Sequence, residues 1–288
     1  MASLQTAAGG YHGGIAPAIS VEEVARQALA IARDVGIEEL DALVPGRPHL
    51  CIDDLHAGYG QMEILHGLSL RVGHKQALCL IGPNGAGKST VLHSIFGFTN
   101  IYSGTISTER DGVALDVTRL SPNEKLRSGG IAYILQDKSV FPGMTVEENL
   151  WMGGYLMAHT AEAKRAAEKV FDKYPRLAAR RKHPAKVLSG GERRLLEISR
   201  ALVMDPQILL VDEPSIGLEP RFIDAVFEIL GDLQHKEGKT VVIVEQNARK
   251  GLEFADIGYV LVSGKLALAG RAKDLLANPD VSRLFLGG

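Results

Sequence analysis

Short apolar runs and capped amphipathic stretches alternate along the chain and predict an α/β fold. The runs at 208–211 and 241–244 are continuous, as expected for strands that are buried on both faces of a parallel sheet. Residues 259–262 and 266–269 are separated by a Ser-Gly-Lys turn and predict a hairpin. Further strands are predicted at 50–55, 68–72, 77–81, 102–106, 112–117 and 131–135, with a turn-rich segment at 58–67 between the first two.

Helix starts are marked by capping residues. Ser121 is a predicted N-cap because Pro follows it at the first helical position. Thr145 is a predicted N-cap because Glu stands three residues after it. From 146 to 186 the pattern is helical and polar, broken only by turns. Because the rest of the chain alternates strands with helices, this stretch indicates a separate helical subdomain over about 139–188.

Residues 1–48 are predicted to form an N-terminal extension, partly disordered and with one or two helices, ahead of a main domain at 49–288. Residues 1–19 are rich in Gly and Ala and lack periodicity. Ser20 and Glu23 can form a capping box for a helix with an apolar stripe, and a short second segment follows. The stripe either docks a partner or folds back on its own domain, and the second alternative is favoured.

The segment between the predicted strand at 77–81 and the helix that follows it has the pattern GxxxxGK[ST]. Its glycines let the backbone turn N–H groups toward a phosphate, with the start of a helix behind them. Lys88 can reach the β- and γ-phosphates, and the Ser89 hydroxyl can bind Mg²⁺. The pattern therefore predicts a nucleoside triphosphate site formed by Gly82, Pro83, Asn84, Gly85, Ala86, Gly87, Lys88, Ser89 and Thr90.

Two carboxylates follow the apolar run 208–211. Asp212 at such a strand end can help to hold Mg²⁺ in a phosphate-loop enzyme, and Glu213 can act as general base for an attacking water. Alone, this pair would be interpreted as a solvated strand end. Together with the glycine-rich loop it indicates a hydrolytic site.

Composition narrows the function classes. The 288 residues carry a formal net charge of −2, so the basic excess expected of a nucleic-acid partner is missing. Cys51 and Cys79 lie in apolar runs and are predicted to be free, buried thiols. No apolar run approaches ~18 residues, and the first residues do not resemble a secretory signal, so we expect a cytoplasmic protein. Several histidines lack the spacing of a metal site, namely His56, His66, His74 and His93.

A second glycine pair stands before another predicted helix, in the segment Leu188-Ser189-Gly190-Gly191-Glu192. It can form a second anion-binding nest, and one triphosphate hardly needs two nests from one chain. With these motifs in order, residues 50–288 resemble the ATP-binding cassette (ABC) ATPases. The loop at 82–90 corresponds to Walker A, Gln136 to the Q-loop, LSGGE to the signature and 208–213 to Walker B, while 215–220 corresponds to the D-loop and Tyr59 to the aromatic that stacks on adenine.

The resemblance implies an α/β P-loop cassette with a RecA-like core, an antiparallel β subdomain and a helical insertion. It implies that two cassettes meet head to tail, as a homo- or heterodimer, and that each signature closes over the partner's ATP. Mg²⁺ would be held by Ser89, Gln136 and Asp212, with Lys88, Glu213 and Gln246 catalytic. Transmembrane permease subunits, and indirectly a solute-binding protein, would be the partners at the inner face of the membrane. Trp151, Met152 and Tyr155 either pack inside the insertion or contact the permease.

Within this family, the chain is similar to the second ATPase subunit of branched-chain amino-acid importers. The segments GYGQMEILHGLSL (58–70), VFPGMTVEENLWMGGY (140–155), YPRL (174–177) and VEQNA (244–248) carry the similarity, together with the C-terminal LANPDVSRLFLGG. Related subunits serve importers of urea and short amides, which is the alternative substrate class. A DNA-repair ATPase of this family would need a long coiled coil between Walker A and the signature, where only ~100 residues without sustained heptads lie.

Gln246 departs from the family pattern, which has a histidine at this position. An amide can donate a hydrogen bond to a γ-phosphate but cannot take up a proton or a positive charge, as a histidine can. The branched-chain subunits also tend to have Gln here. The alternative is a regulatory cassette that binds ATP and leaves hydrolysis to a histidine-bearing partner. Arg193 after the signature and Leu135 before Gln136 also differ from the usual residues, and we expect small effects from both.

Overall fold

The computed structural model describes residues 26–27, 35–136 and 139–286. The helix expected from Ser20 falls almost entirely outside these residues. The first complete element is the short helix α2 (Ile37–Ala42). None of the helices within the described ranges combines the length and the apolar character that crossing a bilayer requires.

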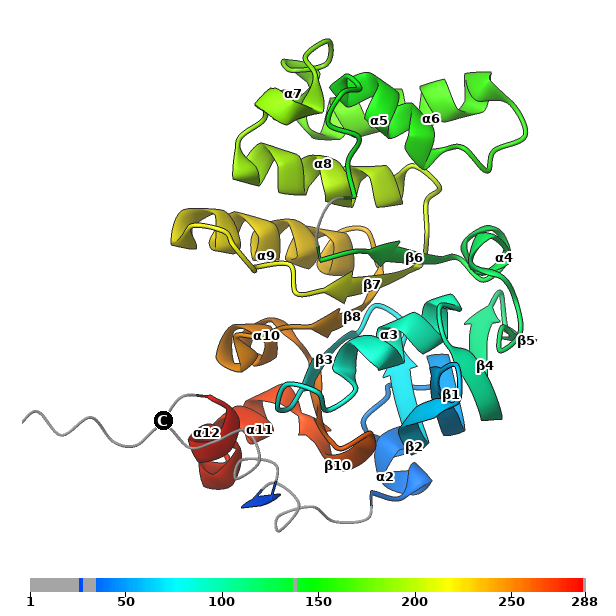
Figure 1. Cartoon of the computed structure of the whole chain (residues 1–288), viewed down its shortest axis with the longest axis vertical. Helices are drawn as coiled ribbons and strands as arrows, with labels where there is room; N and C mark the ends of the chain where they lie inside the picture. Colours follow the sequence, from blue (N-terminus) through cyan, green and yellow to red (C-terminus); the bar gives the residue numbers. More distant parts are fainter. Residues whose placement is uncertain (1–25, 28–34, 137–138, 287–288) are drawn as a thin grey trace, which may run out of the picture.

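A six-stranded sheet forms the centre of the molecule, in the order β10-β9-β3-β8-β7-β6 (Figure 1). The pairs β9–β3, β3–β8, β8–β7 and β7–β6 are parallel, and only β10 runs antiparallel to its neighbour. Every residue of β3, β7 and β8 is buried, as the continuous apolar runs predict. The strands are β3 (Ala77–Ile81), β6 (Ile131–Ile134), β7 (Ile208–Asp212), β8 (Thr240–Val244), β9 (Ile257–Val262) and β10 (Lys265–Arg271).

The two faces of this sheet have different covers. Alternate residues of β3 contribute to two apolar clusters, Leu78 and Leu80 to one and Cys79 and Ile81 to the other. The first cluster lies toward α3 (Lys88–Phe96) and a second sheet. The other is covered by C-terminal helices, α9 (Pro220–His235), α10 (Ala248–Phe254), α11 (Ala272–Ala277) and α12 (Pro279–Phe285).

The second sheet is antiparallel, in the order β2-β1-β4-β5. Its strands are β1 (Pro48–Tyr59), β2 (Met62–Gly73), β4 (Asn100–Arg110) and β5 (Val113–Asp116). The predicted turn at 58–67 is wrong in extent, because Tyr59 pairs with Met62 and the turn itself is only Gly60-Gln61. The glycines that suggested a longer turn lie within strands, where Gly67 takes a φ of +76° next to register irregularities of the β1–β2 pair.

The helical subdomain contains α5 (Val146–Gly153), α6 (Thr160–Lys173), α7 (Pro175–Ala178) and a 3₁₀ turn at Ala185–Val187 (upper part of Figure 1). It has an apolar cluster of its own, to which α8 (Gly190–Leu202) also contributes. The expected capping boxes are confirmed at Thr145 for α5 and at Ser121 for α4 (Pro122–Arg127). Trp151 packs against the subdomain cluster, whereas Met152 and Tyr155 are exposed.

The described part of the N-terminal extension packs on the main domain. Leu40 of α2 is fully buried in the cluster beneath the antiparallel sheet. The buried Arg71 guanidinium donates to Asp41 of α2 at 3.0 Å and to Asp53 of β1 at 2.5 Å. Both cysteines are free as expected, although only Cys79 is fully buried. Residues 36–48 thus share the core of the domain that follows.

Replacing Leu40 with alanine tests this shared core. The Leu40→Ala change removes a fully buried side chain and should lower the free energy of unfolding by about 2–5 kcal/mol. Ile37→Ala on the same helix is the control, because Ile37 is 46% exposed and should change stability by less than about 0.5 kcal/mol. Urea unfolding followed by circular dichroism measures both. Equal, small effects would contradict the packing of α2.

Candidate functional site

The glycine-rich loop joins the end of β3 to the start of α3. At Gly82 the chain passes so close to β9 that an added Cβ would lie 2.1 Å from the Leu261 carbonyl oxygen, so only glycine fits. The loop is also held from one side, since the Gly264 N–H donates to the Ala86 carbonyl at 2.9 Å. The loop geometry is therefore set by the β9–β10 hairpin as well as by its own sequence.

Lys88 lies in the first turn of α3 with its ammonium group folded over the loop. Its Nζ donates to the carbonyls of Gly82 at 2.9 Å and Pro83 at 3.0 Å. Burial lowers the pKa of Lys88, and the negative charges of Glu213 and Asp212 oppose that shift. The ammonium group is thus a cation in a partly desolvated place, where its attraction for phosphate oxygens is stronger than in water.

Asp212 ends β7 and is only 5% exposed. Its Oδ1 accepts from Ser89 Oγ at 3.2 Å, and its Oδ2 accepts from the Tyr133 hydroxyl at 2.8 Å. Burial and the Asp212 charge raise the pKa of Tyr133, so this hydroxyl stays a proton donor. Sequence reasoning missed Tyr133, whose strand β6 meets Asp212 only through the pairing of β6 with β7.

The pair of Ser89 and Asp212 offers hard oxygen donors, which Mg²⁺ prefers. Within the ranges that the structure describes, no group of three or more His, Cys, Asp or Glu side chains could hold a metal ion. A divalent ion here would therefore need further oxygens, which a triphosphate and water supply.

Glu213 follows Asp212 with a φ of +41°, in the left-handed region that non-glycine residues rarely adopt. This conformation turns the chain out of the strand direction directly after Asp212. Burial, followed by the charge of Asp212, raises the pKa of Glu213. Gln136 donates from Nε2 to Glu213 Oε2 at 2.9 Å. Gln136 thus contacts Glu213, the residue predicted to act as general base. That Gln136 binds the metal ion directly stays a prediction.

A cavity of about 450 Å³ brings together half of the predicted site residues. Its lining includes Tyr59 and Gln246. The Tyr59 hydroxyl lies 2.5 Å from His93 Nδ1, so α3 holds this ring in place. His93, which the sequence offered only as a scattered histidine, is a positioning residue. The remaining lining residues are Ile64, Asn84, Gly85, Gly87, Lys88, Ser89, Thr90, Glu213 and Ile216.

Residues 188–192 lie elsewhere in the subunit. Ser189 caps α8 in a capping box with Glu192. Ser189, Gly191 and Glu192 line a different cavity of about 430 Å³, between α7, α8 and α9. None of them lines the cavity that contains Lys88. The two predicted nests are therefore separate within one subunit.

Glu245 is a further residue that the sequence did not reveal. It is 1% exposed and directly precedes Gln246. Its Oε1 accepts from Ser215 Oγ at 2.7 Å and from the Asn247 N–H at 3.1 Å. This carboxylate thus joins the segment around Gln246 to the loop that follows Glu213. Only the contact of two distant loops gives Glu245 this position.

A glycine-rich loop between a buried strand and a helix, with an Asp-Glu pair at the end of another parallel strand of the same sheet, defines a P-loop nucleoside triphosphatase. The separate LSGGE segment narrows the class to the cassette type. Residues 65–216, more than half of the chain, match the ABC transporter family. The chain belongs to this family and is an ATPase of the cassette type.

Known proteins agree with this assignment. BraG of Pseudomonas aeruginosa, a high-affinity branched-chain amino acid transport ATP-binding protein, is 39% identical over 83% of this chain and 100% of its own length. LivF of Archaeoglobus fulgidus, a probable protein of the same kind, is 36% identical over 81% of this chain and 96% of its own. A crystal structure of the ADP conformation of an ABC transporter cassette superposes with a TM-score of 0.72 at 29% identity, covering 84% of this chain and 100% of that one. The predicted fold class is confirmed.

Replacing Tyr133 with phenylalanine tests the support of Asp212. The Tyr133→Phe change removes the hydrogen bond to Oδ2 and should raise the Mg²⁺ concentration for half-maximal ATPase activity about tenfold. Tyr155→Phe is the control, because Tyr155 is 76% exposed. Titrating Mg²⁺ at fixed ATP measures both variants. An unchanged midpoint in Tyr133→Phe would show that this hydroxyl does not orient the carboxylate.

Proposed function

We propose that this chain is the ATP-hydrolysing subunit of an importer for branched-chain amino acids. The observation that carries the mechanism is the separation of the two nests within one subunit. A second cassette, identical or related, would supply its Ser189–Glu192 segment to the ATP that lies over Lys88. Both relatives described above are named for branched-chain amino acid transport, which supports the substrate class over urea and short amides.

The roles of the residues follow from their positions. The adenine would stack on Tyr59, and the phosphates would lie in the loop 82–90 with Lys88 on the β- and γ-phosphates. Ser89 and Asp212, with Gln136 in reach of the same site, would hold Mg²⁺, which neutralises charge on the phosphate oxygens. Glu213 would take the proton of the attacking water, and its raised pKa suits a base.

The assembly follows from the same reading. Closure of the two cassettes over ATP would drive the permease subunits. A solute-binding protein would deliver the amino acid to the permease. The chain would lie on the inner face of the membrane, bound to the permease. The exposed side chains of Met152 and Tyr155 on the helical subdomain fit the permease alternative for these two residues, while Trp151 packs inward.

Replacing Glu213 with glutamine tests the catalytic role. Glu213→Gln should bind ATP within about twofold of the wild type and lose at least about 100-fold in phosphate release, since the amide cannot accept the proton. Glu219→Gln, on the exposed loop that follows, is the control. In the wild type, turnover should fall as pH drops through the pKa of Glu213, which burial raises, because the protonated carboxyl cannot accept the proton of water. Full turnover in Glu213→Gln would refute the assignment.

Gln246 supports a second candidate function, that of a cassette that binds ATP and needs a histidine-bearing partner for hydrolysis. Gln246 lines the cavity with Lys88 and Glu213, which supports a contact between its amide and a γ-phosphate. Turnover that rises more than linearly with wild-type concentration would support a self-sufficient homodimer. A wild type that binds ATP without turnover, while Gln246→His turns over, would support the second candidate.

Uptake by whole cells tests the substrate class. A strain that lacks this chain should lose uptake of radiolabelled leucine, and the wild-type gene should restore it. The Glu213→Gln gene should not, because transport needs hydrolysis. Uptake of radiolabelled urea is measured in the same strains. Loss of urea uptake with intact leucine uptake would replace the proposed solute with an amide.

A further inference from the structure

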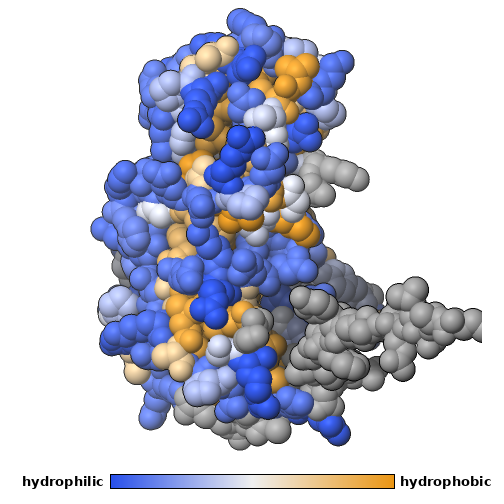
Figure 2. Space-filling model, turned by 90° about the vertical axis from the view of Figure 1, so that its left-hand side faces the viewer, coloured by the Kyte–Doolittle hydropathy of each residue, from blue (hydrophilic) through white to orange (hydrophobic). Residues whose placement is uncertain are grey.

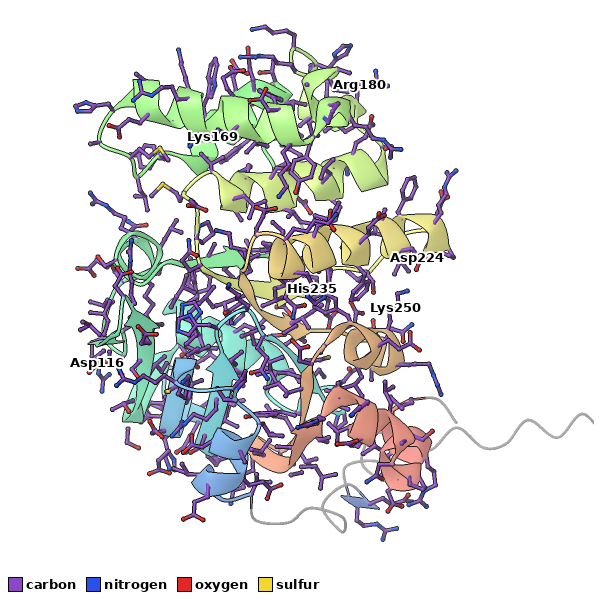
Figure 3. The ribbon with its side chains drawn as sticks, turned by 180° about the vertical axis from the view of Figure 1, so that it is seen from behind. Asp116, Lys169, Arg180, Asp224, His235 and Lys250 are labelled. Atoms are coloured by element: carbon purple, nitrogen blue, oxygen red, sulfur yellow. The ribbon has the colours of Figure 1, made fainter. Side chains whose placement is uncertain are left out.

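The first turn of α9 lies between the signature segment and the segment that contains Gln246. α9 begins at Pro220, at the end of the loop that follows Glu213. In Figure 3, Asp224 of this turn lies beside Lys250 of α10, with Arg180 of the helical subdomain farther up the same edge. Asp224 Oδ1 forms an ion pair with Lys250 Nζ at 2.7 Å. The start of α9 is thus tied to the helix that directly follows Gln246.

On its other side this turn contacts Gly191, the second signature glycine, through one aromatic ring. A Cβ added to Gly191 would lie 2.4 Å from Phe222 Cδ1 and 2.8 Å from Cε1. Real Cβ atoms do not approach a ring so closely, so Gly191 must be glycine as long as Phe222 keeps its place. The Arg221 guanidinium lies 4.7 Å from the ring centroid and covers Phe222.

The neighbouring glycine is different. A Cβ added to Gly190 would have Leu218 Cδ2, at 3.8 Å, as its nearest neighbour, which is an ordinary contact. Within one subunit Gly190 therefore has room for a side chain, and Gly191 has none. The two signature glycines thus have separate reasons for being glycine, and that of Gly191 is internal to the subunit.

From this arrangement we infer that Phe222 is a positioning residue that couples the signature segment to the Gln246 side of the same subunit. The inference rests on the proposed function, in which the two sides serve different ATP molecules. Glu245 holds Ser215 and the backbone of Asn247, Lys250 holds Asp224, and Phe222 holds Gly191. A shift around Gln246 would therefore move α9 and, through the ring, the nest that grips the partner's ATP.

Phe222 lies partly exposed at the surface of the molecule. Figure 2 shows this side of the molecule, where apolar groups lie between hydrophilic ones. The cavity between α7, α8 and α9 leaves about 430 Å³ on one side of the ring. Arg176 and Arg180 contribute to its lining. Phe222 therefore lines this cavity together with Gly191, on which its ring packs.

A double-mutant cycle tests the contact. Gly191→Ala should lower the melting temperature of the purified chain by about 5 °C, because the new Cβ displaces the ring. In a Phe222→Ala background the same change should cost less than about 1 °C. Gly190→Ala is the matched control, and its effect should be the same in both backgrounds. An equal cost of Gly191→Ala with and without the ring would overturn the inference.

Kinetics separates coupling from mere stability. Phe222→Ala should leave the dissociation constant for ATP within about twofold, because the ring lies outside the cavity with Lys88, and lower kcat about tenfold. Phe222→Leu, which keeps an apolar contact, should recover part of kcat. Parallel losses in ATP binding and kcat would reduce Phe222 to a structural role and overturn the coupling. If the wild type alone has no turnover, the self-sufficient homodimer fails, while the melting cycle still decides the contact.

Discussion

The structure depends on three adjacent parallel strands that end at the same edge of the sheet. β3, β8 and β7 are hydrogen-bonded neighbours, with Leu80 opposite Val244 and Asp212 opposite Val244 on the other side. Each strand is followed directly by a segment of the site, namely the glycine-rich loop, the Gln246 segment and Glu213. Because parallel pairing fixes this register, residues more than a hundred positions apart lie around one cavity. Ligands of open α/β sheets bind at the carboxyl ends of strands for this reason.

Charge is concentrated at that edge, and the protein organises it by hydrogen bonds. Asp212, Glu213 and Glu245 are three carboxylates in partly or fully desolvated places, and the charges of the first two act on Lys88. Asp212 is held by two hydroxyls and Glu245 by one hydroxyl and two backbone N–H groups, whereas the Glu213 carboxylate receives, among the described residues, a hydrogen bond from the Gln136 amide alone. The hydroxyl donors fix the orientation of the Asp212 and Glu245 carboxylates. Glu213 has the raised pKa and the strained backbone, so it is the carboxylate best suited to take up a proton.

Residues whose chemistry depends on a short sequence pattern could be predicted from the sequence. The side chains that position those residues from distant parts of the chain could not. The loop 82–90, the Asp212-Glu213 pair and the buried strands are readable because each is a short pattern with a physical reason. Tyr133, His93 and Glu245 are not, because each acts on a residue brought close only by the fold. The extent of β2 was misread for a related reason. Glycines within a strand have the composition of a turn, and only pairing with β1 shows that they belong to the sheet.

The same distinction explains why one motif can contain two kinds of glycine. A pattern such as LSGGE shows where glycines stand, but it does not show which neighbouring atoms a side chain would clash with at each of them. At Gly82 the obstacle is the carbonyl of Leu261, at Gly191 it is the ring of Phe222, and at Gly190 the subunit offers none. The subunit itself therefore gives no steric reason for glycine at position 190. In the head-to-tail pair that we propose, the partner's nucleotide would be the neighbour of Gly190, so the open space at Gly190 and the filled space at Gly191 would divide the motif into an outer and an inner half.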